Sequence, residues 1–316
     1  MDDDPKTGAV QALHARNTSA ARDFVGYGRN PPQAPWPNGA RLAVSLVLNY
    51  EEGSEQSILD GDPVGEAVGE IVRQQERGQR DLAIESMYEY GSRVGVWRLL
   101  DIFDRNQADA TIFACAVAVE RNSEVAAYLR ASSHEVCCHG YRWEEVFRLT
   151  EDQEREHIAL AVRSLENSIG KRPVGWYCRY GPSERTRRLL VETGGFEYDS
   201  DSYADDVPYS VTVQDQPWCV LPYALDTGDM KYWRAPSFGD AQDHYNYLVD
   251  TFDCLYRESE RTSRMMSVGL HCRIAGRPGR AVAIERFIRY ARSHEHVWFA
   301  RRIDIARAWR ARTVQI

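Results

Sequence analysis

The sequence has no hydrophobic run long enough to cross a membrane. Its longest apolar stretches, at 42–48 and 111–119, are about half of the roughly 20 residues that a transmembrane helix needs. The opening residues MDDDPKTGAV are acidic and polar, so they lack the basic and apolar blocks of a secretory signal. We therefore expect a cytoplasmic protein with no membrane partner.

Positive charge is not in excess either. The 316 residues include 39 Lys and Arg against 47 Asp and Glu, which gives a formal net charge of −8. Nucleic acids and anionic membranes favour basic protein surfaces, so neither is expected as the main partner. The hydrophobic content of 43% and the charged content of 27% are typical of a globular chain.

Paired cysteine motifs are missing as well. The cysteine count is seven, an odd number, and no two cysteines form a CxxC pair. Several lie in apolar, strand-like segments, so we expect reduced and buried thiols. The cysteines are Cys115, Cys137, Cys138, Cys178, Cys219, Cys254 and Cys272.

The chain divides into a short arm and one long domain. Residues 1–20 are expected to form a flexible N-terminal arm. No long linker, repeat or low-complexity segment interrupts 21–316, which we expect to be a single domain.

Strand-like and helix-like segments alternate through this domain. Strands are expected at 41–50, 110–119, 134–138, 174–178, 196–198, 220–222, 266–271 and 297–300. Helices are expected at 90–106, 123–131, 150–169, 183–193, 243–258 and 284–293. Thr150 and Gln153 form a capping-box pattern, and Gly170 ends the same helix. This alternation predicts a parallel α/β fold, and about six to eight such units predict a complete or distorted barrel.

In such barrels the chemistry lies at the carboxyl ends of the strands. The polar residues expected there are Tyr50, Glu51, Glu52, His139, Arg179, Tyr180 and His271, with Asp199 after a shorter strand. A guanidinium at position 179 would suit an anionic or carboxylate substrate group. Asp199 begins an acidic segment with Asp201 that fits hydrogen-bonding turns better than a calcium loop, because the glycine and terminal Glu of an EF-hand are missing.

Glu51 and Glu52 form the most suggestive pair. A carboxylate at a barrel mouth can act as a general base, a metal ligand or a hydrogen-bond acceptor. The same pair would also fit a solvated acidic turn.

The histidines allow several roles. His139 is a candidate zinc ligand, acid–base group or core residue. A zinc site at this turn would need a second His four residues later, and that position is occupied by Trp143. His134 begins its strand, so a structural role at the opposite end is expected. His271 ends an apolar strand and is a candidate general acid.

Six segments together resemble the motifs of the polysaccharide deacetylase superfamily (NodB homology, carbohydrate esterase family 4). They are GYGRNPPQAPWPNGARLAVSLVLNYEEGSEQSILDGD, YEYGSRVGVWRLL, HEVCCHGYRW, GGFEYDSDSYADDVPY, LPYALDTGDM and GLHCRIAGRPGR. The resemblance is strongest to the metal-independent allantoinase branch of urate catabolism. It implies a distorted (β/α)7-type barrel, the NodB-like deacetylase fold.

The resemblance also assigns roles to positions. Glu51 stands where deacetylases place the catalytic-base Asp, and Glu52 stands at the metal-binding Asp. His139 matches the first metal-binding His, and Trp143 replaces the second. His271 matches the His of the last motif, which acts as the acid.

The resemblance also bears on Arg179 and on the metal. Arg179 falls near the family's third motif. His139 is the one metal-binding His that the sequence keeps, so a zinc site of three protein ligands does not form from these positions and no cofactor is expected. Trp143 would instead wall a small flat ring, and Tyr50, Arg179, Tyr180 and Asp199 are the other expected substrate-binding residues.

Three functions remain open at this stage. The first is metal-independent hydrolysis of a cyclic amide, with allantoin converted to allantoate. Under this hypothesis Glu51 is the base and Glu52 assists it. His139 and His271 are candidates for oxyanion stabilisation and for the acid. The segment GWYCRYGPSERTRR differs from that of close allantoinases, so another cyclic amide or imide is an alternative substrate. The second is zinc-dependent N-deacetylation of an amino sugar or peptidoglycan, through Glu52, His139 and a further ligand. The third is a non-catalytic protein that binds small molecules in this pocket. The resembling branch also implies a homotetramer.

Overall fold

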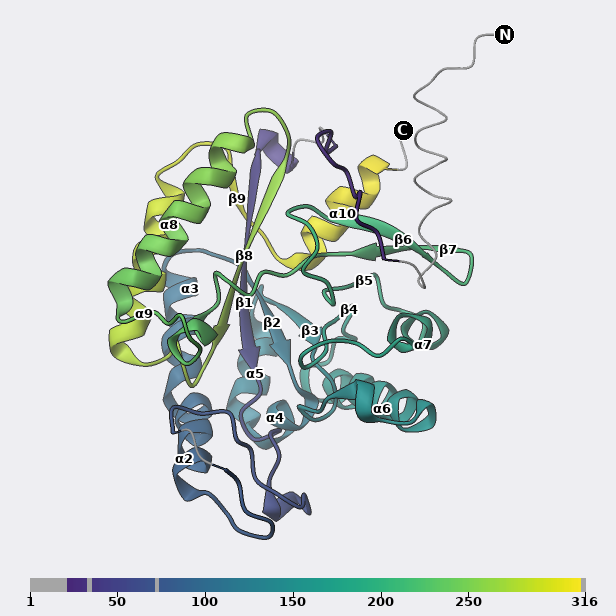
Figure 1. The fold of residues 1–316 in the computed structure, drawn as a ribbon, viewed down its shortest axis with the longest axis vertical. Helices are drawn as coiled ribbons and strands as arrows, with labels where there is room; N and C mark the ends of the chain where they lie inside the picture. Colours follow the sequence, from purple (N-terminus) through teal and green to yellow (C-terminus); the bar gives the residue numbers. More distant parts are fainter. Residues whose placement is uncertain (1–21, 33–35, 72–73, 314–316) are drawn as a thin grey trace.

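The computed structural model describes residues 22–32, 36–71 and 74–313, so the arm expected over 1–20 lies outside them. Within them a nine-stranded sheet runs through the molecule, with helices arranged around it (Figure 1). The strands are β1 (Leu42–Tyr50), β2 (Ala110–Ala114), β3 (Glu135–Cys138), β4 (Gly175–Trp176), β5 (Tyr198–Asp199), β6 (Tyr209–Val213), β7 (Gln216–Val220), β8 (Arg264–His271) and β9 (Val297–Phe299).

The sheet curls into a half-barrel. Its strand order is β6-β7-β5-β4-β3-β2-β1-β8, β9 also pairs with β1, and every pair is parallel except β6 with β7. No hydrogen-bonded pair joins the end strands β6 and β8 among the described residues. The distorted α/β barrel predicted from the sequence is confirmed in this open form.

β1 is the centre of the sheet. It pairs with β2, β8 and β9, and all nine of its residues are buried. Its sequence LAVSLVLNY is almost continuously apolar, as expected for a strand covered on both faces. The residues that follow β1 are therefore delivered to the middle of the carboxyl-end edge.

The α-helices cover the outside of the curled sheet (Figure 1). They are α2 (Leu82–Tyr90), α3 (Val96–Arg105), α4 (Ala116–Arg121), α5 (Ser123–Ala131), α6 (Glu151–Ile169), α7 (Thr186–Thr193), α8 (Ala241–Glu258), α9 (Pro278–Arg292) and α10 (Arg302–Thr313). A π-helical segment, η3 (Gly91–Gly95), joins α2 to α3. The predicted capping box of Thr150 and Gln153 opens α6, and Gly170 ends it with φ 69°.

Several predicted boundaries are wrong. The strand expected over 110–119 ends at Ala114, and its apolar tail forms α4, because a short buried run does not distinguish strand from helix. The helices α2 and α10 and the strand β6 were not predicted. Gln214 and Asp215 join β6 to β7 with φ 48° and 60°, so this hairpin turn lacks the usual glycine signal.

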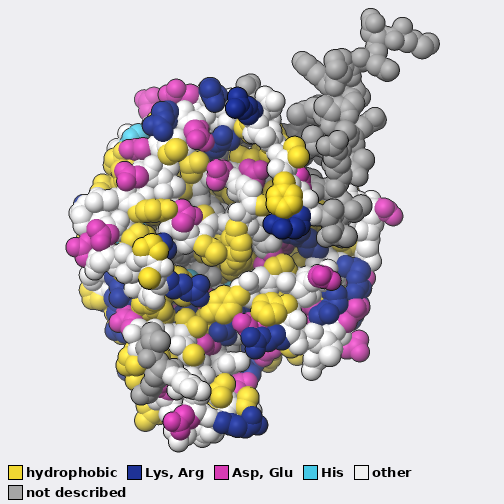
Figure 2. All heavy atoms as spheres, in the orientation of Figure 1, with side chains coloured by type: hydrophobic (Ala, Val, Ile, Leu, Met, Phe, Trp, Pro, Cys, Tyr) yellow, Lys and Arg dark blue, Asp and Glu magenta, His cyan; other side chains and the backbone are white. Residues whose placement is uncertain are grey.

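The cysteines and the surface agree with the globular chain that the composition predicts. Six of the seven cysteines are free and buried; Cys254 on α8 is free but exposed, which corrects the expectation for that residue. In the described part of the chain, no helix combines the length and apolarity needed to span a bilayer. Figure 2 shows side chains of both charges spread over the face drawn there, with hydrophobic side chains gathered near its centre.

Candidate active site

Glu51 is the centre of a buried polar cluster at the carboxyl-end edge of the sheet. Its Oε1 lies 3.2 Å from Nε2 of His139 and 3.7 Å from Nε2 of His271. Its Oε2 lies 2.7 Å from Nη1 of Arg273. The Glu51 side chain is only 2% exposed, so these three groups replace solvent around the carboxylate.

The parallel sheet explains why these residues meet. Glu51 follows β1, His139 follows β3, and His271 is the last residue of β8. Asn49 of β1 is in register with His271, so the ends of β1 and β8 lie side by side. Three residues that are far apart in sequence are thereby placed at one edge.

His271 is oriented by Asp229 of the 3-10 helix η5 (Asp229–Tyr232). Its Nδ1 lies 2.7 Å from Oδ1 of Asp229, whose Oδ2 accepts the backbone N–H groups of His271 and Ala275. Since a carboxylate only accepts, Nδ1 carries a proton and Nε2 faces Glu51. Burial lowers the pKa of His271, but Asp229 and Glu51 outweigh it, and the pKa lies above its ordinary 6.5. His271 therefore keeps its second proton to higher pH than an ordinary histidine does.

His139 is fixed by two acceptors. Its Nδ1 lies 2.9 Å from the carbonyl oxygen of Tyr177, and its ring stacks on that tyrosine at a centroid distance of 5.1 Å. The carbonyl oxygen accepts the Nδ1–H, and Nε2 lies within hydrogen-bond distance of Oε1 of Glu51. His139 therefore holds Glu51 Oε1 in place and leaves Oε2 on the side of Arg273.

The Glu51 carboxylate is kept ionised by its neighbours. Burial alone would raise the pKa of Glu51, but Arg273, His271 and His139 together lower it well below the ordinary value. A carboxylate that favours the ionised form and an imidazole that favours the protonated form therefore face each other across 3.7 Å.

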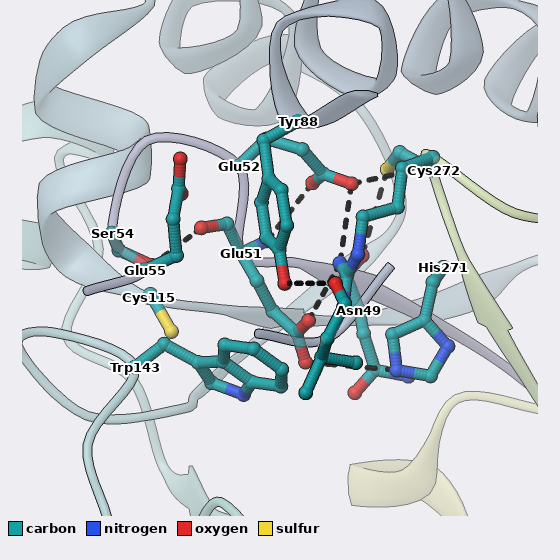
Figure 3. Close-up of polar contacts among 12 residues, drawn as sticks. Asn49, Glu51, Glu52, Ser54, Glu55, Tyr88, Cys115, Trp143, His271 and Cys272 are labelled. Atoms are coloured by element: carbon teal, nitrogen blue, oxygen red, sulfur yellow. Dashed lines mark hydrogen bonds and ion pairs between the residues drawn. The ribbon is translucent and has the colours of Figure 1, made fainter. Parts of the chain in front are cut away.

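Glu52 does not point into this gap. Figure 3 shows its carboxylate directed away from that of Glu51, on the side of Cys272. It accepts the backbone N–H groups of Glu51 and Arg273, each at 3.0 Å. Burial raises the pKa of Glu52. The expected assistance of Glu52 in base catalysis is corrected accordingly: the side chain braces the loop that carries the base.

Two glycines make this bracing possible. A Cβ at Gly91 would overlap the carboxyl group of Glu52, and a Cβ at Gly95 would overlap the carbonyl group of Cys272. The π-helical segment η3 therefore packs its backbone directly against the site.

Aromatic rings wall the cluster. Trp143 is 3% exposed and lies 6.4 Å from Tyr88 between ring centroids. The guanidinium of Arg179 stacks on Trp143 at 3.7 Å. Arg179 also donates to the Trp143 carbonyl and pairs with Glu66 at 2.9 Å, so it positions the indole instead of offering a free cation. Tyr180 lies next to them, is 43% exposed, and stands at the rim.

Two residues expected in the site are not brought to it. Tyr50 alternates to the opposite face of β1 from Asn49, where its hydroxyl lies 2.9 Å from Oγ of Ser92. Asp199 pairs with Arg187 at 2.8 Å and accepts the indole N–H of Trp218 at 2.5 Å. Its carboxylate therefore ties β5 to β7 and α7.

The donor set does not fit a zinc ion. No group of three or more His, Cys, Asp or Glu side chains in the described ranges is arranged to hold a metal. Glu52 already faces Nη1 of Arg273 at 3.4 Å, so a divalent cation there would meet a buried positive charge. Trp143, at the position expected for a second His ligand, offers no donor to a metal.

The sequence alone did not point to four residues of this region: Arg273, Asp229, Tyr88 and Trp233. Arg273 and Asp229 lie within the motif segments GLHCRIAGRPGR and LPYALDTGDM, Arg273 two residues after β8 and Asp229 at the start of η5. The signal available in the sequence was their place within these two motif segments, and for Arg273 its position two residues after His271.

Comparison with known proteins settles the family. The model of the family described as polysaccharide deacetylase matches residues 77–198. A Schizosaccharomyces pombe protein named as a polysaccharide deacetylase is 37% identical over 92% of this chain and 97% of its own. This chain belongs to the polysaccharide deacetylase family.

Two solved structures are similar over almost the whole chain. One, titled a probable polysaccharide deacetylase from Pseudomonas aeruginosa PAO1, is 49% identical with a TM-score of 0.88, covering 92% of this chain and 98% of its own. The other, titled Puue allantoinase, is 48% identical with a TM-score of 0.88, covering 92% and 97%. The NodB-like fold is therefore confirmed, and these deacetylase and allantoinase relatives are hydrolases of carbon–nitrogen bonds other than peptide bonds, as predicted for this chain.

Proposed function

We propose that this protein opens the ring of a small cyclic amide by hydrolysis, with allantoin as the best single substrate and allantoate as the product. The observation that carries the proposal is the approach of the Glu51 carboxylate to within 3.7 Å of Nε2 of His271, with an aromatic wall beside them. The neighbours of each group favour an ionised Glu51 and a protonated His271. The 48% identity to a protein titled allantoinase supports this substrate over others of its class.

The first step forms a bond between water and the ring carbonyl carbon. Glu51 takes one proton from the water as its oxygen attacks that carbon, which places a negative charge on the carbonyl oxygen. Collapse of this intermediate breaks the carbon–nitrogen bond, and the leaving nitrogen takes the Nε2 proton of His271. Transfer of the proton from Glu51 to His271 restores the starting state.

The residues present are sufficient in kind for this chemistry without a metal ion. A positioned acid or base contributes about 10²–10⁴-fold each, and a donor to the oxyanion contributes about 10²–10³-fold. The closure of the site by Trp143, Tyr88 and the loop of Glu66 strengthens these electrostatic effects by excluding water.

A substrate panel with and without chelator tests the proposal. The panel contains allantoin, hydantoin, dihydrouracil, succinimide and N-acetylglucosamine oligomers, each assayed in EDTA and with added zinc. We expect turnover of allantoin, or of another cyclic amide, that EDTA leaves unchanged. Deacetylation of the sugar oligomers that EDTA abolishes and zinc restores would instead establish the family's deacetylase chemistry.

A further inference from the structure

Unpartnered N–H groups lie on Arg273, which pairs with Glu51, and on its neighbour Trp233. Nε and Nη2 of Arg273 and Nε1 of Trp233 are buried atoms that have no hydrogen-bond partner among the residues that the structure describes. The guanidinium carbon of Arg273 lies 6.0 Å from the centre of the Trp233 ring, so the two side chains are neighbours. Arg273 as a whole is 1% exposed.

A buried cation with unused donors is unusual. Buried polar groups in folded proteins are nearly always paired, and each exception calls for an explanation. The chain offers a direct contrast in Arg302, which is also fully buried. Arg302 donates to Ser200, to Ser267 and to the carbonyls of Leu221 and Pro222, as a structural arginine does.

The surroundings of Arg273 indicate which kind of ligand would accept hydrogen bonds from its unpartnered N–H groups. Its guanidinium carbon lies 4.4 Å from the Tyr88 ring and 5.1 Å from the Trp143 ring, so flat apolar walls flank it. Guanidinium and indole nitrogens only donate, so the missing partner must supply acceptors. A planar group with a carbonyl oxygen meets both conditions.

We propose that Arg273 and Trp233 together bind the carbonyl oxygen of the substrate and hold the negative charge that it gains during attack. This inference rests on the proposed function and adds the binding groups for the reacting oxygen. Nη1 of Arg273 contacts the base Glu51, which places the remaining donors of the same guanidinium next to the carbon under attack.

Arg273 and Trp233, which we call the oxyanion receptor, lie close in the chain to the groups that form and orient the acid His271. Arg273 follows His271 by two residues, and Trp233 directly follows η5, whose first residue Asp229 orients His271. Arg179 is less suited to the receptor role, since Glu66 and the Trp143 carbonyl already occupy its Nη2 and Nη1. Preorganised donors in a dry site stabilise a developing oxyanion strongly, because they need no rearrangement during the reaction.

Two variants and two matched controls test the receptor. Arg273→Lys keeps the charge but removes the fork of donors, and Trp233→Phe keeps an apolar ring but removes the N–H. Arg277→Lys and Trp97→Phe are the controls, because Arg277 stacks on Tyr90 and Trp97 packs on Tyr128, outside the cluster. These four variants, and the double variant that combines Arg273→Lys with Trp233→Phe, are first compared with wild type by circular dichroism and thermal melting.

The first readout is calorimetric binding of hydantoin, which does not depend on turnover. We expect at least tenfold weaker binding in Arg273→Lys and Trp233→Phe and no change in the controls. The second readout is allantoin turnover, where Arg273→Lys should lower kcat at least a hundredfold and the two variants combined should lose less than the product of their separate effects. If Arg273→Lys does not fold, Trp233→Phe decides the question.

Affinity and kcat within twofold of wild type in Trp233→Phe or a folded Arg273→Lys would overturn the receptor. Wild-type protein that binds hydantoin but hydrolyses no cyclic amide would overturn the proposed function and leave the receptor standing. Wild-type protein that neither binds nor hydrolyses these rings would overturn both.

Discussion

The Nδ1 atom of His271 lies 2.7 Å from Oδ1 of Asp229. This contact fixes the tautomer of the histidine, directs Nε2 toward Glu51, and raises the pKa of the imidazole above its ordinary 6.5. The pairing therefore decides the pH range in which His271 has a proton to give.

Asp229→Asn should move the alkaline limb of the pH–rate profile to lower pH. Asp229 raises the pKa of His271, so its charge extends the protonated form to higher pH, and the amide removes that charge. The wild-type profile of kcat/KM should fall only above pH 6.5, and the variant should fall earlier. An alkaline limb that stays in place in a folded variant would show that His271 does not set it.

His271→Ala should lower kcat at least a hundredfold because the leaving nitrogen loses its proton donor. Steady-state kinetics on allantoin measure this, and far-UV circular dichroism checks the fold. His134→Gln is the control, because His134 accepts the Ala110 N–H at the opposite end of β3 and lies outside the cluster. Near-normal turnover in His271→Ala would refute the acid role.

Gly95→Ala should destabilise the fold by about 1–3 kcal/mol, since its Cβ would overlap the Cys272 carbonyl. The measurement is the free energy of unfolding from urea titration. Gly279→Ala on α9 is the matched control, because nothing lies within 4 Å of its Cβ position. Equal stability of both variants would mean that η3 is not in tight contact with the loop after β8.

Glu66→Ala should destabilise the protein by about 3–5 kcal/mol, because it leaves the guanidinium of Arg179 without its buried partner. The released Arg179 would also stop holding Trp143, so KM for allantoin should rise. Glu70→Ala is the control, since Glu70 pairs with Arg280 at the surface. A change no larger than that of the control, in urea titration and in KM, would contradict this role.

Much of the fold was predictable because its signals are local. The long helix α6 carries both of its caps in the sequence, and β1 is an almost continuous apolar run. The end of β2 was misplaced because its apolar tail continues into α4 without a polar break. The hairpin of β6 and β7 was missed because its turn uses Gln214 and Asp215 in place of glycine.

The site was predictable where it depends on strand ends. Glu51, His139 and His271 follow strands that the sheet places together, as the barrel rule expects. Asp229 begins the short helix η5, and Trp233 and Arg273 follow η5 and β8, so their distances to Glu51 depend on how the connections after β7 and β8 fold back. Tyr50 and Asp199 do lie at strand ends, but their side chains do not reach Glu51. Strand alternation turns Tyr50 to the opposite face of β1, and an ion pair with Arg187 holds Asp199.

The most direct test compares Glu51→Gln with wild-type protein for allantoin hydrolysis, both stripped of metal by EDTA. The amide keeps the shape of the side chain but accepts a proton poorly, and kcat should fall at least a hundredfold. Wild-type turnover should survive the chelator. Near-normal kcat in Glu51→Gln would contradict the claim that the Glu51 carboxylate activates water without a metal ion. So would a wild-type protein that loses its activity in EDTA and regains it with zinc.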